Sequence, residues 1–355
     1  MLVGLATPRS LAVPISLPQR IVLAARPTGE PSAADFRLER LPLPEPGEGE
    51  LRLRVLYLSL DPYMRGRMNA GKSYMPPLQI DEVMDGGTVA QVEVSNHPDY
   101  RPGEIVLTHL GWQTHAVVTS KQILRRLTAA QAPISTALGV YGMPGFAAWA
   151  GLAEIGKPDA GETVVVAAAS GPVGATVGQI AHLRGARSVG IAGGAQKCAY
   201  LRDELGFDAA VDHRAADFAE QLKAACPDGI DVYFENVGGA VWDAVLPLLN
   251  DFARVPVCGL VAHYNDTTAP PGPDRRAALM SAILTRSLTL RGFIQREFTA
   301  RYPEFLREMG HWLHEGKMRY REDIVDGLEN APAAFIGLLK GRNFGKLLIR
   351  VSAAD

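Results

Sequence analysis

The segment from residue 163 to residue 197 constrains the fold of this chain more than any other part of it. It opens with a continuous apolar run, Thr163 to Ala168, which is typical of a parallel strand covered on both faces. A glycine-containing turn follows, and apolar residues then recur at helical spacing up to Ala181, which predicts an amphipathic helix. A second apolar run, Arg187 to Ala192, predicts a second strand. This order of elements predicts a βαβ unit that binds a dinucleotide.

The turn after the first strand reads Ala-Ser-Gly-Pro-Val-Gly, from Ala169 to Gly174. Gly171 would bring the backbone close to a pyrophosphate, and Gly174 would let the following helix pack tightly on the sheet. The segment Gly171, Pro172, Val173 and Gly174 opens this helix, whose free N-terminal N–H groups would point at the phosphates. The first glycine of the usual fingerprint is an alanine here, so the turn alone also fits a plain strand-to-helix connection. The strands and the helix around it favour the nucleotide site.

The residues after the second strand separate the two nicotinamide cofactors. That strand is followed by Gly193 and, four residues later, by Lys197, whereas no carboxylate occurs between Glu162 and Asp203. A site that prefers NAD usually places an acid about 20 residues beyond the fingerprint, where it holds the ribose 2′-hydroxyl. A lysine without that acid suits a 2′-phosphate, with a charge-assisted hydrogen bond of about 1.5–3 kcal/mol. The sequence predicts NADP(H), although a solvated helix lysine is the alternative for Lys197.

The composition excludes several other classes of protein. The chain has 355 residues, so two domains are expected. Its formal net charge is −2 and no basic block occurs, which gives no electrostatic case for nucleic acid or for an anionic membrane. No apolar stretch reaches the ~20 residues that span a bilayer. The segment before Gln19 lacks a basic region ahead of an apolar core, so a simple extension is favoured over a secretory or organelle signal.

The cysteines and histidines predict an enzyme without a metal. The three cysteines, Cys198, Cys226 and Cys258, lie far apart in sequence. They form neither a disulfide framework nor the closely spaced ligand set of a structural zinc lobe, and their usage suits the reducing cytoplasm. The eight histidines show no metal-ligand spacing.

The pattern along the chain is bipartite. Up to about Val140, short runs such as Leu51 to Tyr57 and Thr88 to Val94 alternate between proline and glycine breaks, which predicts a mostly β domain. From about Gly142, strands alternate with helices, which predicts a doubly wound parallel sheet. Further strands of that sheet are expected at 208–211, 229–234, 254–260 and 289–294.

The tail, from about Tyr302, is predicted to hold two helices and a last strand, Lys346 to Val351, that returns to the first domain. We therefore predict a discontinuous substrate domain, 1–140 and 302–355, and a dinucleotide-binding domain, 141–301.

A set of longer motifs carries a family resemblance along almost the whole chain, from about Pro18 to Val351. These motifs are Ser59–Met68, Gly142–Phe146, Ala168–Gly174, Ile191–Cys198, Tyr233–Gly239, Val257–Leu260, Asp326–Pro332 and Leu338–Lys346. The chain resembles zinc-independent members of the medium-chain dehydrogenase/reductase superfamily. More narrowly, it is similar to the group of prostaglandin reductases, leukotriene hydroxydehydrogenases and alkenal reductases, and within it to bacterial NADPH-dependent curcumin reductases. The resemblance implies a Rossmann sheet, a GroES-like catalytic domain and a homodimer.

The resemblance also implies which residues hold NADPH. It assigns the turn from Gly171 to Gly174 to the pyrophosphate and Lys197 to the 2′-phosphate. The other positions that match the cofactor lining are Gly193, Asn236, Cys258 to Tyr264, Phe293, Ile294, Gln295 and Asn343. Relatives often carry a tyrosine near the phosphate where this chain has His213 followed by Arg214. Ala147 and Ala148 replace a Thr-Ala pair of the family.

The implied reaction is reduction of a carbon–carbon double bond conjugated to a carbonyl. Hydride would reach the β carbon, the enolate oxygen would need a hydrogen-bond donor, and the α carbon would need a proton. Tyr264 is the first candidate for the hydrogen-bond donor, and its alternative role is only to position the cofactor. Tyr63 is the second candidate, and its alternative role is a hydrogen bond that serves packing. Specificity is expected in the loops 69–79 and 264–273. A quinone reductase and a non-catalytic NADPH-binding protein stay open, while the absent zinc ligands disfavour an alcohol dehydrogenase.

Overall fold

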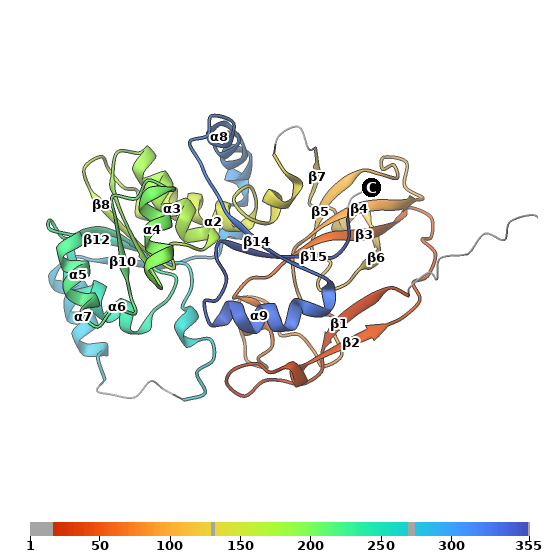
Figure 1. The fold of residues 1–355 in the computed structure, drawn as a ribbon, viewed down its shortest axis with the longest axis horizontal. Helices are drawn as coiled ribbons and strands as arrows, with labels where there is room; N and C mark the ends of the chain where they lie inside the picture. The colour runs from red at the N-terminus through yellow and green to blue at the C-terminus, as the bar shows by residue number, and fades with distance from the viewer. Residues whose placement is uncertain (1–16, 129–131, 269–273, 354–355) are drawn as a thin grey trace, which may run out of the picture.

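The computed structural model describes residues 17–128, 132–268 and 274–353. The end of the predicted specificity loop 264–273 and most of the segment before Gln19 lie outside these ranges. Two sheets lie side by side (Figure 1). The first has green and cyan strands, and the second has orange strands together with the blue strands β14 and β15, which lie on the side facing the first sheet.

The first sheet is parallel and has six strands, in the order β10-β9-β8-β11-β12-β13. Its strands are β8 (Thr163–Ala167), β9 (Arg187–Ala192), β10 (Ala209–Asp212), β11 (Ile230–Phe234), β12 (Leu249–Val257) and β13 (Thr289–Gly292). The strand order reverses beside β8, the first of these strands in the chain, as in a Rossmann sheet. The predicted α/β class, with its doubly wound parallel sheet, is confirmed.

Helices cover this sheet and connect its strands. They are α2 (Met143–Gly151), α3 (Pro172–Leu183), α4 (Ala195–Asp203), α5 (Phe218–Ala225), α6 (Gly239–Val245) and α7 (Arg276–Thr285). β8 is buried along its whole length, which explains its continuous apolar sequence.

The strand limits follow the apolar runs where the strands are buried. β9 has the predicted limits, whereas β12 begins at Leu249 rather than at the predicted Arg254. The early part of β12 includes an exposed aspartate and an exposed phenylalanine, Asp251 and Phe252, so it lacks the apolar run that marks the other strands.

The second sheet is mostly antiparallel, with the order β14-β15-β3-β4-β5-β7, and β6 also pairs with β3. Its strands are β3 (Glu50–Ser59), β4 (Thr88–Ser95), β5 (Ile105–Thr108), β6 (His115–Thr119), β7 (Arg125–Leu127), β14 (Glu322–Asp326) and β15 (Lys346–Arg350). β1 (Gln19–Leu23) and β2 (Phe36–Arg40) form a separate antiparallel pair. Because Leu348 of β15 lies opposite Ser59 of β3, the last strand returns to the first part of the chain.

Three further helices lie around this sheet or at the junction of the two sheets: α1 (Met64–Arg67), α8 (Tyr302–His314) and α9 (Ala331–Leu339). Phe305 and Met309 of α8 join the hydrophobic core that Phe146 and Trp149 of α2 share with β8. The proposed domain boundaries at 140 and 302 stay a prediction.

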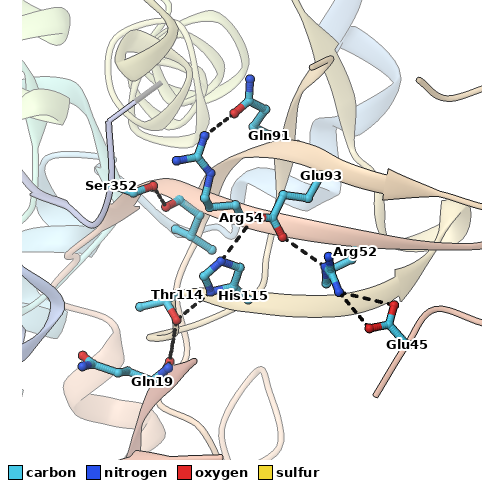
Figure 2. Close-up of polar contacts among 10 residues, drawn as sticks. Gln19, Glu45, Arg52, Arg54, Gln91, Glu93, Thr114, His115 and Ser352 are labelled. Carbon is cyan, nitrogen blue, oxygen red and sulfur yellow. Dashed lines mark hydrogen bonds and ion pairs between the residues drawn. The ribbon is translucent and has the colours of Figure 1, made fainter. Parts of the chain in front are cut away.

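A polar cluster fixes β3 between its neighbours (Figure 2). Arg52 donates from Nε to Glu93 of β4 at 3.1 Å, and Arg54 donates to Gln91 at 2.5 Å. The hydroxyl of Ser352 donates to a backbone carbonyl of β3 at 2.7 Å. The cluster therefore ties the segment after β15 to the strand at the centre of this sheet.

No helix among the described residues is both long enough and apolar enough to cross a membrane.

Candidate dinucleotide and substrate site

The turn between β8 and α3 has the geometry that the fingerprint predicts. A Cβ added at Gly174 would lie 2.6 Å from the carbonyl oxygen of Ala168, so only glycine lets α3 pack this closely on the strand. The packing role predicted for Gly174 is confirmed. Ala168 itself has φ +52°, a strained value for alanine. A Cβ added at Gly171 would lie 3.3 Å from the carbonyl oxygen of Ala168 and would meet no other atom within 4 Å. The space beside Gly171 is therefore open to a ligand.

Three basic side chains gather beyond the end of β9. A Cβ at Gly193 would lie 2.8 Å from Nε of Arg214 and 2.9 Å from Nε2 of His213, so both side chains fold over this glycine. Lys197, in the first turn of α4, donates from Nζ to the carbonyl of Gly341 at 2.8 Å. Burial and then the charge of Arg214 lower the pKa values of Lys197 and of His213. The charges of Lys197 and Arg214 repel each other, and a phosphate group would relieve that repulsion.

Asp212 is a carboxylate at this end of the sheet that the sequence interpretation missed. It ends β10, and its Oδ1 accepts hydrogen bonds from the backbone N–H groups of Gly194 and Arg214, both at 2.9 Å. The Gly194 bond is the main cause that lowers the pKa of Asp212. The carboxylate therefore holds in place the loop that carries the basic group. The expected position of an acid was the segment after β9, whereas Asp212 ends β10, the neighbouring strand in the sheet.

The end of β11 bridges to β8 through Asn236, whose Nδ2 donates to the carbonyl of Ala167 at 2.9 Å. Glu235, which sequence reasoning did not single out, is buried beside it. Its Oε1 accepts from the backbone N–H groups of Val237 at 2.6 Å and Gly238 at 2.9 Å. Burial raises the pKa of Glu235. The motif Tyr233–Gly239, quoted for the family resemblance, contains this glutamate and was the available signal.

The loop after β12 carries Cys258 and Tyr264. The backbone N–H of Cys258 donates to the carbonyl of Glu235 at 2.9 Å, and burial raises the pKa of the thiol to about 12. The Tyr264 hydroxyl accepts from the backbone N–H of Leu260 at 3.4 Å. It would lie 3.2 Å from a Cβ at Gly259, so the phenol folds back over its own loop. Burial raises the pKa of Tyr264, which keeps the phenol protonated.

The remaining predicted cofactor residues come from two further segments. Phe293 is 5% exposed and packs edge-to-face on Phe234, so its side chain is part of the core. The backbone N–H of Ile294 donates to Glu297, and Gln295 begins the short helix η7 (Gln295–Arg301). Asn343 donates from Nδ2 to the carbonyl of Gly345 at 2.8 Å. Their contacts with a cofactor stay predictions.

Tyr63 lies on the other side of the junction, immediately before α1. Burial, followed by the charges of Asp61 and Asp85, raises its pKa well above the usual value. Asp61 is itself buried and pairs with the buried Lys346 of β15 at 2.7 Å. The corner that carries Tyr63 is therefore fixed by an ion pair between distant parts of the chain.

Hydrogen bonds join the two sides of the junction. Arg65 of α1 donates from Nε to Asn265 at 2.9 Å, next to Tyr264. Arg296 of η7 donates to the carbonyl of Tyr74 at 2.7 Å, which holds the predicted specificity loop 69–79. Burial and then Tyr264 raise the pKa of the Tyr74 phenol. The structure thus brings the loops of Tyr74 and Tyr264 together. Arg65 and Arg296 were missed because their partners are far away in sequence.

No group of three or more histidine, cysteine, aspartate or glutamate side chains in the described ranges is placed to hold a metal ion.

A Rossmann sheet with a dinucleotide turn, joined to a mostly antiparallel sheet that its own tail completes, defines an oxidoreductase of the medium-chain dehydrogenase/reductase class. Residues 19–125 match the family model described as the N-terminal domain of oxidoreductase. Residues 172–311 match the model described as zinc-binding dehydrogenase.

Characterised relatives narrow the class. The chain is 57% identical to the NADPH-dependent curcumin reductase of Escherichia coli K12, over 95% of this chain and 98% of that protein. It is 40% identical to prostaglandin reductase 1 of Oryctolagus cuniculus, over 90% and 89%, and 37% identical to the NADP(+)-dependent 2-alkenal reductase of Nicotiana tabacum, over 94% and 97%. The crystal structure of CurA from Vibrio vulnificus in complex with NADPH is 54% identical, covers 94% of this chain and 99% of that one, and superposes with a TM-score of 0.91. The chain belongs to the group of medium-chain reductases that contains these proteins.

Proposed function

We propose that this protein is a cytoplasmic, zinc-independent reductase that uses NADPH to saturate carbon–carbon double bonds conjugated to a carbonyl. The observation that carries the proposal is the arrangement along the carboxyl edge of the parallel sheet. The basic group of Lys197, His213 and Arg214 lies beyond β9 and β10, and the protonated phenol of Tyr264 lies beyond β12. A dinucleotide that crosses this edge would have its 2′-phosphate at the first position and its nicotinamide at the second. The names of the relatives support the same activity.

The chain's residues fit NADPH. Gly171 and the N-terminus of α3 would hold the pyrophosphate, because the turn is open at Gly171 and the first N–H groups of a helix lack acceptors within it. Lys197 and Arg214 would hold the 2′-phosphate. Bound NADPH supplies the hydride.

Tyr264 is assigned to the developing negative charge. Its phenol is desolvated and neutral, so it can donate a hydrogen bond to the substrate's carbonyl oxygen and supply a proton to the α carbon, directly or through water. Tyr63, also buried and neutral, would hold the substrate oxygen from the opposite side of the junction.

The test is NADPH oxidation against a panel of enones, enals and quinones, with mass spectrometry of the products. A two-hydrogen gain with the carbonyl intact supports the proposal. Oxidation with quinones alone would replace it with a quinone reductase, and tight NADPH binding without turnover would replace it with a non-catalytic binding protein.

The role of Tyr264 has its own test. Tyr264→Phe is expected to lower kcat for an enone by about 100-fold, the contribution of a positioned acid, with little change in melting temperature. Tyr100→Phe, in the other half of the molecule, is the matched control. Unchanged turnover in Tyr264→Phe would assign the proton to water.

The exposed edge of the parallel sheet supports a homodimer, in which a second copy of the chain is the partner. β13 is the last strand in the sheet order and is mostly exposed. Next to it, Phe252 is 70% exposed with φ +63°, and Met280 and Leu284 of α7 are 63% and 80% exposed. An open strand edge beside apolar side chains is suited to pairing with itself across a twofold axis.

Light scattering after gel filtration tests this assembly. The wild-type chain is expected to be a dimer and Leu284→Lys a monomer. Leu124→Lys, at an equally apolar site that is 63% exposed in the other sheet region, is expected to stay dimeric. A monomeric wild-type chain would refute the homodimer.

A further inference from the structure

A buried arginine, Arg65, joins three loops at the junction of the two sheets. It lies in α1 and is only 3% exposed. Its Nε donates to the side-chain oxygen of Asn265 at 2.9 Å, and its Nη1 donates to the side-chain oxygen of Asn69 at 2.6 Å. Its Nη2 donates to the backbone carbonyl of Gly29 at 2.7 Å. Each of the three nitrogens of the guanidinium therefore holds an acceptor from a different loop.

These three acceptors are all uncharged. Burial lowers the pKa of Arg65, and the charge of Asp35 opposes that effect only in part. A buried guanidinium with neutral partners costs stability, and an apolar side chain of similar size would avoid that cost. The guanidinium supplies geometry instead, because its planar fork of N–H donors holds several acceptors in fixed directions. An arrangement that costs stability while it fixes loops at a candidate site indicates a role in the reaction.

The bond from Arg65 to Asn265 connects the two segments that carry the candidate phenols. Tyr63 precedes Arg65 by two residues, and Tyr264 immediately precedes Asn265. The loop of Tyr264 is also close to the third acceptor, since a Cβ added at Gly29 would lie 3.8 Å from the backbone oxygen of Asn265. The guanidinium therefore fixes the loop of one phenol against the corner that carries the other.

We propose that Arg65 is a positioning residue for the reduction and that, through Asn265, it holds Tyr264 at the separation from Tyr63 that a bound carbonyl oxygen requires. This inference rests on the proposed function. The substrate oxygen has to lie within hydrogen-bond reach of a phenol, about 2.6–3.2 Å. A misplacement of about 1 Å can slow a reaction about 100-fold. Loss of the bond should therefore slow the chemical step more than it weakens cofactor binding.

The experiment removes the bond from the side of the Tyr264 loop, which leaves the buried Arg65 in place. The full-length wild type is compared with Asn265→Ala and with Asn265→Asp, which keeps an acceptor oxygen for Arg65. The matched control is Asn250→Ala, because Asn250 donates to Asp231 at 2.8 Å at the opposite end of β12. The measured quantities are kcat and KM for an enone, the Kd for NADPH and the melting temperature.

We expect kcat to fall about 10- to 100-fold in Asn265→Ala, and we expect Asn265→Asp to retain most of the wild-type value. The Kd for NADPH should stay within about threefold, because the phosphates of the cofactor would be held beyond β8 and β9. Asn250→Ala should keep the wild-type kcat, whatever its effect on the melting temperature.

Double variants separate positioning from a general loss of stability. If Arg65 and Asn265 act as one bond, adding Asn265→Ala to Arg65→Gln should lower kcat no further. Because the bond acts through Tyr264, Asn265→Ala should also have no further effect when it is added to Tyr264→Phe. A loss caused only by reduced stability would multiply in both double variants. The second comparison leaves Arg65 in place, so it decides the question even if Arg65→Gln does not fold.

Unchanged kcat in Asn265→Ala, or an equal further loss when it is added to Tyr264→Phe, would overturn the inference while the wild-type protein still reduces enones. Failure of the wild-type protein to reduce any enone would overturn the proposed function, and this inference with it. The two failures are therefore distinguishable.

Discussion

Removal of the Lys197 ammonium group tests how the chain chooses its cofactor. The ammonium group of Lys197 is held by its hydrogen bond to the carbonyl of Gly341, and burial, followed by the charge of Arg214, lowers its pKa. A 2′-phosphate would supply the missing anion. One charge-assisted hydrogen bond is worth about 1.5–3 kcal/mol, which corresponds to about 10- to 150-fold in affinity. We therefore expect Lys197→Ala to raise the Kd for NADPH by that factor and to leave the Kd for NADH within about twofold, because only NADPH carries the extra phosphate.

The assay is calorimetric titration of each cofactor, paired with steady-state KM values and a melting curve. Lys197→Arg keeps the charge and should lose less affinity than Lys197→Ala. Lys223→Ala removes the same charge from an exposed position on α5 and should leave both cofactors unaffected. Equal losses for NADPH and NADH, or no loss for NADPH, would refute the assignment of Lys197 to the phosphate.

Three other substitutions test the packing and charge of the site. Gly174→Ala forces a Cβ to within 2.6 Å of the Ala168 carbonyl, so we expect about 1–3 kcal/mol of destabilisation in chemical unfolding and weaker NADPH binding. Lys346→Met leaves the buried carboxylate of Asp61 unpaired and should cost about 3–5 kcal/mol, part of which Asp61→Asn restores in the double variant. Burial raises the pKa of Glu235, so the folded state holds that proton more tightly than the unfolded state does. Stability should therefore fall as the pH rises from the usual pKa of a glutamate towards the folded value, and Glu235→Gln, followed by unfolding at several pH values, should lack this fall.

The parallel sheet could be predicted closely because its strands are buried on both faces. β8 and β9 appear in the sequence as apolar runs, and their limits in the structure agree with those runs to within a residue. By contrast, β14 has no buried residue, and β7 has only three residues. Such strands exist because a distant neighbour pairs with them, and no local pattern records that neighbour.

The residues of the candidate site also divide into those with a local signal in the sequence and those without one. Lys197 has a local signal, a lysine where an acid is absent, and its contact with the 2′-phosphate stays a prediction. Asp212 and Arg65 could not be predicted, since each acts through a partner that the fold brings to it from elsewhere. Arg65 and Asn265, for example, are 200 residues apart. Sequence patterns record burial and turns well, but they do not record which loop ends meet above a sheet.

The pairing of β15 with β3 has a consequence for the order in which the chain can fold during synthesis. The parallel sheet uses strands that lie between residues 163 and 292, so it can form before the last segment leaves the ribosome. The Tyr57–Ser59 end of β3 must wait, since its partner β15 carries the lysine that neutralises Asp61 and that follows this aspartate by 285 residues. Until then the nascent protein carries an unpaired strand edge, a feature that promotes aggregation, and Asp61 lacks the partner with which it is later buried. Deletion of the last strand would therefore damage the sheet that the N-terminal part of the chain began.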